Sequence, residues 1–149
     1  MDTGASAHMS LDAGNLTSLS STPPHKHVIV GNGSSIPVTH SGHVRLPTSH
    51  SLTLRDVLVT PRIVKNLISV RQFTKDNSCL VEFDPWGFFV KDLRTGRVIL
   101  RCSSSGDLYP LTPSPQAITA DSTLWHRRLG PPRPQRILVP HFVVFASHQ

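Results

Sequence analysis

The residue types that could carry chemistry stand at the start of the chain, where Asp2, Thr3 and Gly4 follow Met1. Such a triplet can hold a carboxylate on a tight turn, because the threonine hydroxyl can lock the turn and glycine lets two backbones approach closely. Two carboxylates held together share one proton, so one can activate water while the other protonates an amide carbonyl oxygen. The triplet occurs once in the sequence, so this chemistry requires Asp2 from each of two copies.

Taken alone, the triplet more often marks a simple Asp-initiated turn. The residues around it change that interpretation, because residues 2–9 read Asp-Thr-Gly-Ala-Ser-Ala-His-Met. This run resembles the protease motif of copia-type LTR retrotransposon Pol polyproteins. The resemblance implies a retropepsin-like aspartic endopeptidase that processes Gag-Pol, with Asp2, Thr3 and Gly4 as its catalytic turn.

Further blocks follow in the order that this family uses. An Asn-Gly turn at Gly31, Asn32 and Gly33 separates two β-like runs and predicts a hairpin. The resemblance makes its tip the flap that closes over a peptide substrate. The remaining blocks are similar to the family's later strands and to its GAG-pre-integrase segment; they lie at residues 54–61, 66–70, 106–111 and 124–130.

From residue 28 onward, short β-like runs alternate with turn residues, a pattern typical of an all-β sandwich or barrel. A short helix is expected at residues 66–74, with Asn66 as its N-cap, and a β-meander at residues 79–101. Together with the resemblance, these patterns predict a mainly β fold: a retropepsin-like closed β-barrel with one short helix, followed by a β-meander and an irregular tail.

We expect three parts along the chain. Residues 1–77 would form a retropepsin-like Pol β-barrel domain that is truncated at its N-terminus. Residues 78–130 would hold the β-meander and a GAG-pre-integrase-like segment, and residues 131–149 would be an unstructured tail foreign to the family.

The truncation bears on activity. In the family an apolar strand precedes the catalytic aspartate, whereas here only Met1 precedes it. Because N-terminal strands support the catalytic turn and the dimer, we expect an impaired endopeptidase. The alternative is a non-catalytic β-barrel remnant that is inert or binds nucleic acid weakly.

The distribution of charge bears on which binding partners can be expected. The chain has 15 Lys and Arg against 9 Asp and Glu, and the excess falls after residue 60. It is spread singly, with no aromatic pattern for base stacking, so nucleic acid is not an expected partner of this fragment. The expected partners are a second copy of the chain and a polyprotein peptide. The sequence shows neither a signal peptide nor a membrane-spanning run, and we expect an intracellular, cytoplasmic protein.

No metal or cofactor is expected. The resemblance makes His126 the first ligand of a zinc site, but Pro131 stands where the second histidine should be and no Cys-x-x-Cys follows. Cys79 and Cys102 are expected to be small buried apolar groups. The other histidines are expected to be exposed loop residues, among them His8, His25, His27, His40 and His43.

Overall fold

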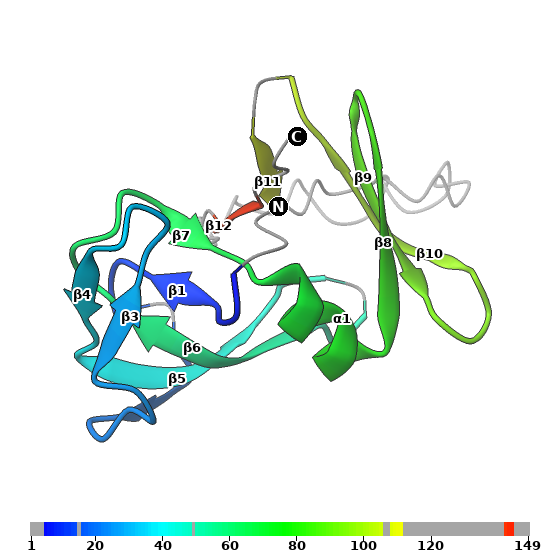
Figure 1. Cartoon of the computed structure of the whole chain (residues 1–149). Coiled ribbons are helices and arrows are strands. Elements are labelled where there is room, and N and C mark those ends of the chain that lie inside the picture. Colours follow the sequence, from blue (N-terminus) through cyan, green and yellow to red (C-terminus); the bar gives the residue numbers. More distant parts are fainter. Residues whose placement is uncertain (1–4, 15, 49, 106–107, 112–141, 145–149) are drawn as a thin grey trace, which may run out of the picture.

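The computed structural model describes residues 5–14, 16–48, 50–105, 108–111 and 142–144. These residues are mainly β with one short helix, as predicted (Figure 1). The elements are β1 (Met9–Ser10), β2 (Ser18–Ser20), β3 (His27–Ile29), β4 (Ser35–Pro37), β5 (His40–Arg45), β6 (Thr53–Val59), β7 (Asn66–Leu67), α1 (Val70–Asn77), β8 (Cys79–Asp84), β9 (Gly87–Asp92), β10 (Val98–Ser103), β11 (Tyr109–Leu111) and β12 (Phe142–Val144).

Seven of the strands form one sheet, in the order β11-β12-β7-β1-β6-β5-β2. At its centre β1 runs parallel to β6 and antiparallel to β7. The edge strands β2 and β11 are not paired with each other, so the sheet of the described residues stays open. The closed barrel expected from the sequence is therefore not found in this part of the chain. Both edge strands are three residues long. The residues of β2 are exposed, whereas β11 contacts β10 of the three-stranded sheet.

The helix begins later than predicted. It spans Val70–Asn77, and its N-cap is Ser69, whose Oγ accepts a hydrogen bond from the Gln72 N–H at 3.4 Å. Asn66, the predicted N-cap, lies in β7, and its Oδ1 accepts a hydrogen bond from the Leu11 N–H at 2.8 Å. The asparagine side chain thus serves a cross-sheet contact, which leaves the next suitable capping residue to begin the helix.

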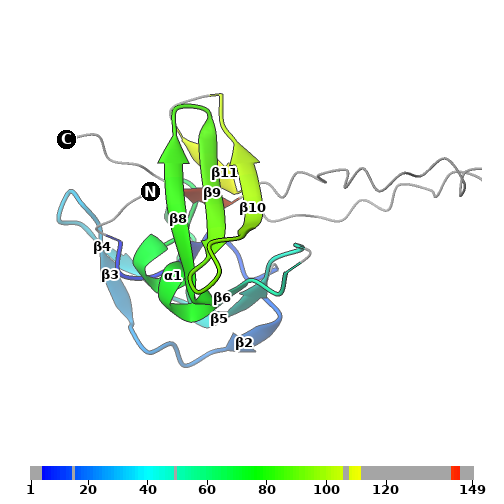
Figure 2. The same cartoon turned by 90° about the vertical axis from the view of Figure 1, so that its right-hand side faces the viewer.

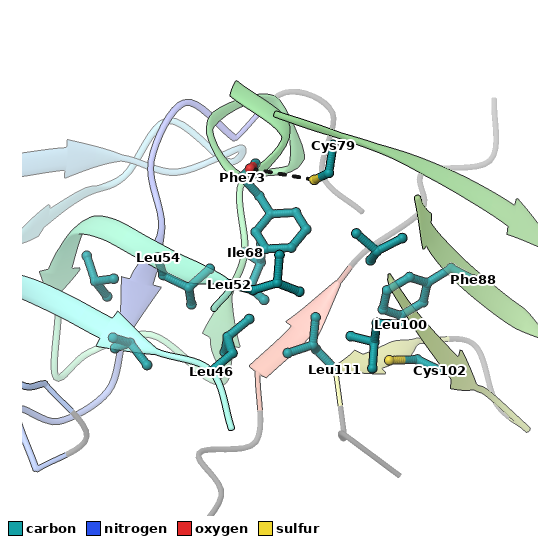
Figure 3. Close-up of a cluster of buried hydrophobic side chains, with 13 residues drawn as sticks. Leu46, Leu52, Leu54, Ile68, Phe73, Cys79, Phe88, Leu100, Cys102 and Leu111 are labelled. Atoms are coloured by element: carbon teal, nitrogen blue, oxygen red, sulfur yellow. Dashed lines mark hydrogen bonds between the residues drawn. The ribbon is translucent and has the colours of Figure 1, made fainter. Parts of the chain in front are cut away.

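The β-meander predicted after the helix is present as a three-stranded antiparallel sheet, β8-β9-β10. Figure 2 shows it standing beside α1, with β11 behind it. One hydrophobic core joins both sheets: it includes Leu54 of β6, Phe73 of α1 and Phe88 of β9, all essentially inaccessible to solvent (Figure 3). The two sheets are therefore packed as one folding unit.

The C-terminal region differs from the expected unstructured tail at three residues. Phe142–Val144 form β12, which is parallel to β7 and antiparallel to β11. A Phe-Val-Val run has high β propensity, and here it pairs with the short strands β7 and β11 on either side. The rest of residues 131–149 lies outside the described residues.

Candidate functional site

The predicted catalytic residues Asp2, Thr3 and Gly4 lie outside the described residues, which begin at Ala5. Ala5 is buried, and its carbonyl oxygen accepts a hydrogen bond from Ser69 Oγ at 2.6 Å. Ser69 is also the N-cap of α1. The chain is therefore fixed to the start of the helix directly after the Asp-Thr-Gly triplet.

His8 makes a second connection to the same serine. Its Nδ1 accepts a hydrogen bond from the Ser69 N–H at 3.2 Å, while its carbonyl oxygen accepts one from the Leu58 N–H at 2.9 Å. The ring is fully buried, and Nε2 has no hydrogen-bond partner among the described residues. Burial lowers the pKa of His8 from 6.5 to about 4, so the imidazole is neutral at pH 7. Since Nδ1 is an acceptor, the ring proton is on Nε2.

The expectation of an exposed loop histidine is wrong for His8. The useful signal in the sequence was the position of His8 within residues 2–9, the run that resembles the family motif. His25, His27 and His43 are exposed, as expected, although the last two lie in strands. His40 is half-buried in β5.

The Asn66 side chain of β7 and the backbone of Thr60, directly after β6, complete the support. The Leu11 N–H is bound by Asn66, and the Ser10 carbonyl accepts a hydrogen bond from the Thr60 N–H at 2.8 Å. Residues 5–11 are thus held on one side by β6 and on the other by β7 and the start of α1. Three sequence blocks that are far apart in the chain meet at this point: residues 5–9, which are the described part of the first block, and residues 54–61 and 66–70.

The predicted hairpin is confirmed, with Gly31, Asn32 and Gly33 exposed at its tip between β3 and β4. Gly33 donates from its N–H to the Val30 carbonyl at 2.8 Å and has a φ of 81°, in the left-handed region that favours glycine. Asn32 Oδ1 accepts a hydrogen bond from the Ser34 N–H at 2.9 Å. A turn with a left-handed glycine after it is one of the common hairpin loops, which explains the strength of the Asn-Gly signal.

A cavity of about 670 Å³ lies between this hairpin and the loop that follows β6. We call it the hairpin cavity. It is mainly apolar, and it adjoins the supported segment because Met9 is part of its wall. The lining residues are Met9, Val30, Asn32, Ser34, Ser35, Ile36, Arg62, Ile63, Val64, Lys65, Leu67 and Leu108. Sequence reasoning missed the loop residues, since nothing in their spacing indicated that they face the hairpin.

The other groups that could do chemistry in the described part of the chain are less suited to a functional site. Cys79 and Cys102 are buried as expected, and burial raises the pKa of their thiols to about 11 and about 12, so both are unreactive at neutral pH. Among the described residues, no three His, Cys, Asp or Glu side chains are grouped so that they could hold a metal ion. Within the same part of the chain, no helix has the length and apolar character needed to cross a membrane.

Comparison with known proteins agrees with the resemblance at the level of the family. Residues 1–78 match the family described as "Pol polyprotein, beta-barrel domain", to which the chain belongs. That match covers the whole hydrogen-bonded support around residues 5–11 together with the hairpin and α1. No solved structure matches the chain at a significant level.

Two curated relatives extend the match over most of the chain. The Retrovirus-related Pol polyproteins from transposons RE2 and RE1 of Arabidopsis thaliana are 41% and 38% identical over 143 and 145 residues, which are 89% and 90% of this chain. The chain spans about one tenth of the length of each relative. It corresponds to the part of a copia-type retrotransposon Pol polyprotein that contains the β-barrel domain.

Proposed function

We propose that this domain is one half of a retropepsin-like aspartic endopeptidase that cleaves the Pol polyprotein. Two copies of the chain would each contribute Asp2, with Thr3 and Gly4 shaping the turn. One carboxylate would take a proton from the attacking water while the other donates a proton to the scissile carbonyl oxygen. Dimerisation is part of the proposal, because each chain has a single Asp-Thr-Gly triplet.

The observation that carries the proposal is the buried hydrogen-bonded support immediately after the triplet. Ser69 contacts Ala5 and His8 at the same time, and Asn66 binds the Leu11 N–H. A catalytic carboxylate must be held to within a fraction of an ångström, which requires rigid neighbours rather than a loose loop. The buried hydrogen bonds of Ser69 and Asn66 fix the backbone at Ala5 and Leu11, on the C-terminal side of the triplet.

The hairpin cavity supports the same proposal. It is mainly apolar and of the size of sites that enclose several side chains of a ligand. Gly31, Asn32 and Gly33 lie at the tip of the hairpin on one side of it, where a flap that closes over an extended peptide would lie. In the proposed enzyme the hairpin would exclude water from the peptide while Asp2 acts on it.

The alternative of a non-catalytic remnant that binds nucleic acid would use the outer face of the β8-β9-β10 sheet. There the guanidinium of Arg101 lies over the Phe89 ring at 4.5 Å from its centroid, and Lys91 forms an ion pair with Glu82. The two cations are therefore engaged within the sheet, and the ring face is covered. Neither cation of this face can contact a phosphate without giving up that interaction, so this face offers little free positive charge.

The experiment compares the full chain with its Asp2→Asn variant, using a polypeptide from the same Pol sequence as substrate and mass spectrometry to detect cleavage at acidic pH. We expect Asp2→Asn to abolish cleavage, because an amide can neither share the proton nor take one from water. Asp12→Asn is the matched control. Asp12 is an exposed aspartate near the start of the chain, so this variant should cleave the substrate at the same rate as the unmodified chain. Undiminished cleavage by Asp2→Asn, or cleavage by a chain that sedimentation shows to be monomeric, would refute the proposal.

A further inference from the structure

The walls of the hairpin cavity combine apolar and cationic side chains. The apolar part of the wall includes Met9, Ile36 of β4, Ile63 and Leu67. Val64 also lines the cavity although 89% of its surface is exposed, so a large apolar side chain stands at the opening without cover in the described structure. Such a cavity suits apolar side chains of a ligand.

Two positively charged residues, Arg62 and Lys65, flank Ile63 and Val64 in the sequence. Arg62 and Lys65 both line the cavity and both are exposed. No aspartate or glutamate is among the lining residues, and within the described part of the chain neither cation has an ion-pair partner. Positive charge at the opening of an apolar cavity attracts anionic groups and repels cationic ones.

The edge of β4 can receive an extended chain. In the described residues β4 pairs with β3 alone, with Val28 opposite Ile36 and Ile29 opposite Ser35. The hydrogen bond from the Val30 N–H to the Ser34 carbonyl fixes which residues face β3. Strand alternation then directs the N–H and C=O groups of Ser35 away from β3, and Ser35 is part of the cavity wall.

The C-terminal part of this chain has the wrong charge to fill the cavity itself. Residues 112–149 contain four arginines and a single acidic residue, Asp121. Arg62 and Lys65 would repel such a segment. An occupant from outside the chain, extended, apolar at its centre and acidic beside that centre, is complementary to the wall in both shape and charge.

We propose that the hairpin cavity selects peptide segments in which an acidic residue lies next to an apolar one, and that Arg62 and Lys65 are the residues that determine this specificity. The inference rests on the proposed function, since it names the sequences that the proposed endopeptidase would accept. An apolar side chain enters between Met9 and Ile63, and the neighbouring carboxylate stays at the opening beside the two cations.

The test is a binding measurement with fluorescein-labelled octapeptides that share an apolar centre and differ only in two flanking residues, both Glu or both Gln. With the full chain at low salt, we expect the Glu peptide to bind about fivefold more tightly, because exposed ion pairs contribute modestly each. Added salt should reduce this preference by screening. In the double variant Arg62→Gln, Lys65→Gln the preference should disappear, whereas Arg71→Gln, an exposed arginine of α1 outside the cavity, should keep it.

A charge reversal provides a gain of function that misfolding cannot imitate. Arg62→Glu combined with Lys65→Glu should bind a Lys-flanked peptide more tightly than the Glu-flanked one. Equal binding of the Glu and Gln peptides to the unmodified chain, absence of binding to either, or a preference that survives in the double variant would each overturn the inference.

The binding test and the cleavage test fail separately. If the Glu peptide binds preferentially but is not cut, and Asp2→Asn binds it equally well, the selective cavity stands and the endopeptidase proposal fails. If both peptides are cut at equal rates, the endopeptidase proposal stands and the selection by Arg62 and Lys65 fails.

Discussion

The part of the chain up to residue 78 and the β8-β9-β10 meander use their polar groups in opposite ways. In the first, the buried side chains of Asn66 and Ser69 hydrogen-bond to the backbone of Leu11 and Ala5, and buried His8 accepts a hydrogen bond from the Ser69 N–H. In the meander the polar contacts are at the surface, as in the ion pair between Glu82 and Lys91.

The meander's interior is apolar and aromatic instead. The ring centroids of Phe83 and Phe88 are 5.7 Å apart, and Tyr109 of β11 stands edge-on to Phe83 at 5.1 Å. The tyrosine hydroxyl donates to the Asp84 carbonyl at 3.1 Å, so its polar end is satisfied. Side chains of this kind stabilise mainly by the burial of apolar surface.

The difference indicates that the part up to residue 78 holds its backbone in a defined position, whereas the meander mainly contributes stability. The buried hydrogen bonds of Ser69 and Asn66 give the backbone near the start of the chain a defined position, and this network is retained although His8 Nε2 has no partner among the described residues. That network lies directly after residues 2–4. The meander lies on the far side of α1 from the hairpin (Figures 1 and 2) and contributes Phe88 and Val90 to the core that it shares with β6 and α1.

The sharpest way to break this comparison is to remove a ring from the meander. Phe88 is 1% exposed and belongs to the core that also contains Leu54 and Phe73. Phe88→Ala should lower the free energy of unfolding by about 3–5 kcal/mol, the usual cost of deleting a buried phenylalanine ring. Because the core is shared, both parts should unfold in one transition. Circular dichroism and hydrogen exchange at the backbone amides of each part measure this.

Leu80→Ala is the control for that experiment. Leu80 is also an apolar residue of the meander, but 43% of its surface is exposed, so its truncation should cost less than about 1 kcal/mol. Two separate transitions in Phe88→Ala, with residues 5–78 still protected from exchange after the meander has opened, would show that the meander is dispensable for the support around Ala5.

The buried network should reveal itself through pH. His8 has a pKa of about 4 in the folded chain against 6.5 when exposed, so between these values the unfolded chain binds a proton that the folded chain does not. Stability should therefore be full above about pH 6.5 and fall as the pH decreases towards 4, with a loss of about 2 kcal/mol by about pH 5. Urea unfolding at a series of pH values measures this slope.

His8→Asn isolates the contribution of the imidazole. An asparagine oxygen can accept the hydrogen bond from the Ser69 N–H but does not titrate, so the loss of stability between about pH 7 and pH 5 should shrink by about 2 kcal/mol. The same substitution at His25, an exposed histidine, should leave the slope unchanged. An equal slope in His8→Asn and in the unmodified chain would show that protonation of His8 is not what destabilises the fold.

The sequence predicted the local elements well where turn chemistry is strong. The hairpin around Asn32 and the three strands of the meander were found because Asn-Gly, Pro-Trp-Gly and Arg-Thr-Gly punctuate alternating apolar runs. The two-residue strands β1 and β7 were not found, since each exists only through its partners in the sheet. Periodicity cannot detect a strand that spans only a single two-residue repeat.

The candidate site was predictable only in part. The motif at residues 2–9 and the flap-like turn can be found in the sequence, because their residue types have local roles. The side chains that support the motif could not be assigned: Asn66 is a reasonable helix cap by local rules, and only its contact with Leu11, 55 positions earlier, shows its use. The cations at the cavity opening depend on how the loop after β6 folds back towards the hairpin.

The smallest expected effect concerns the meander's surface. Glu82 and Lys91 form an ion pair across β8 and β9, with side chains 48% and 25% exposed. Glu82→Gln should lower the free energy of unfolding by less than about 1 kcal/mol, because water and salt screen an exposed pair and ordering two long side chains offsets its attraction. The difference from the unmodified chain should vanish at about 1 M salt in urea titrations. A salt-independent loss above about 2 kcal/mol would mean that the meander, too, depends on a polar contact, and the contrast between the two parts would fail.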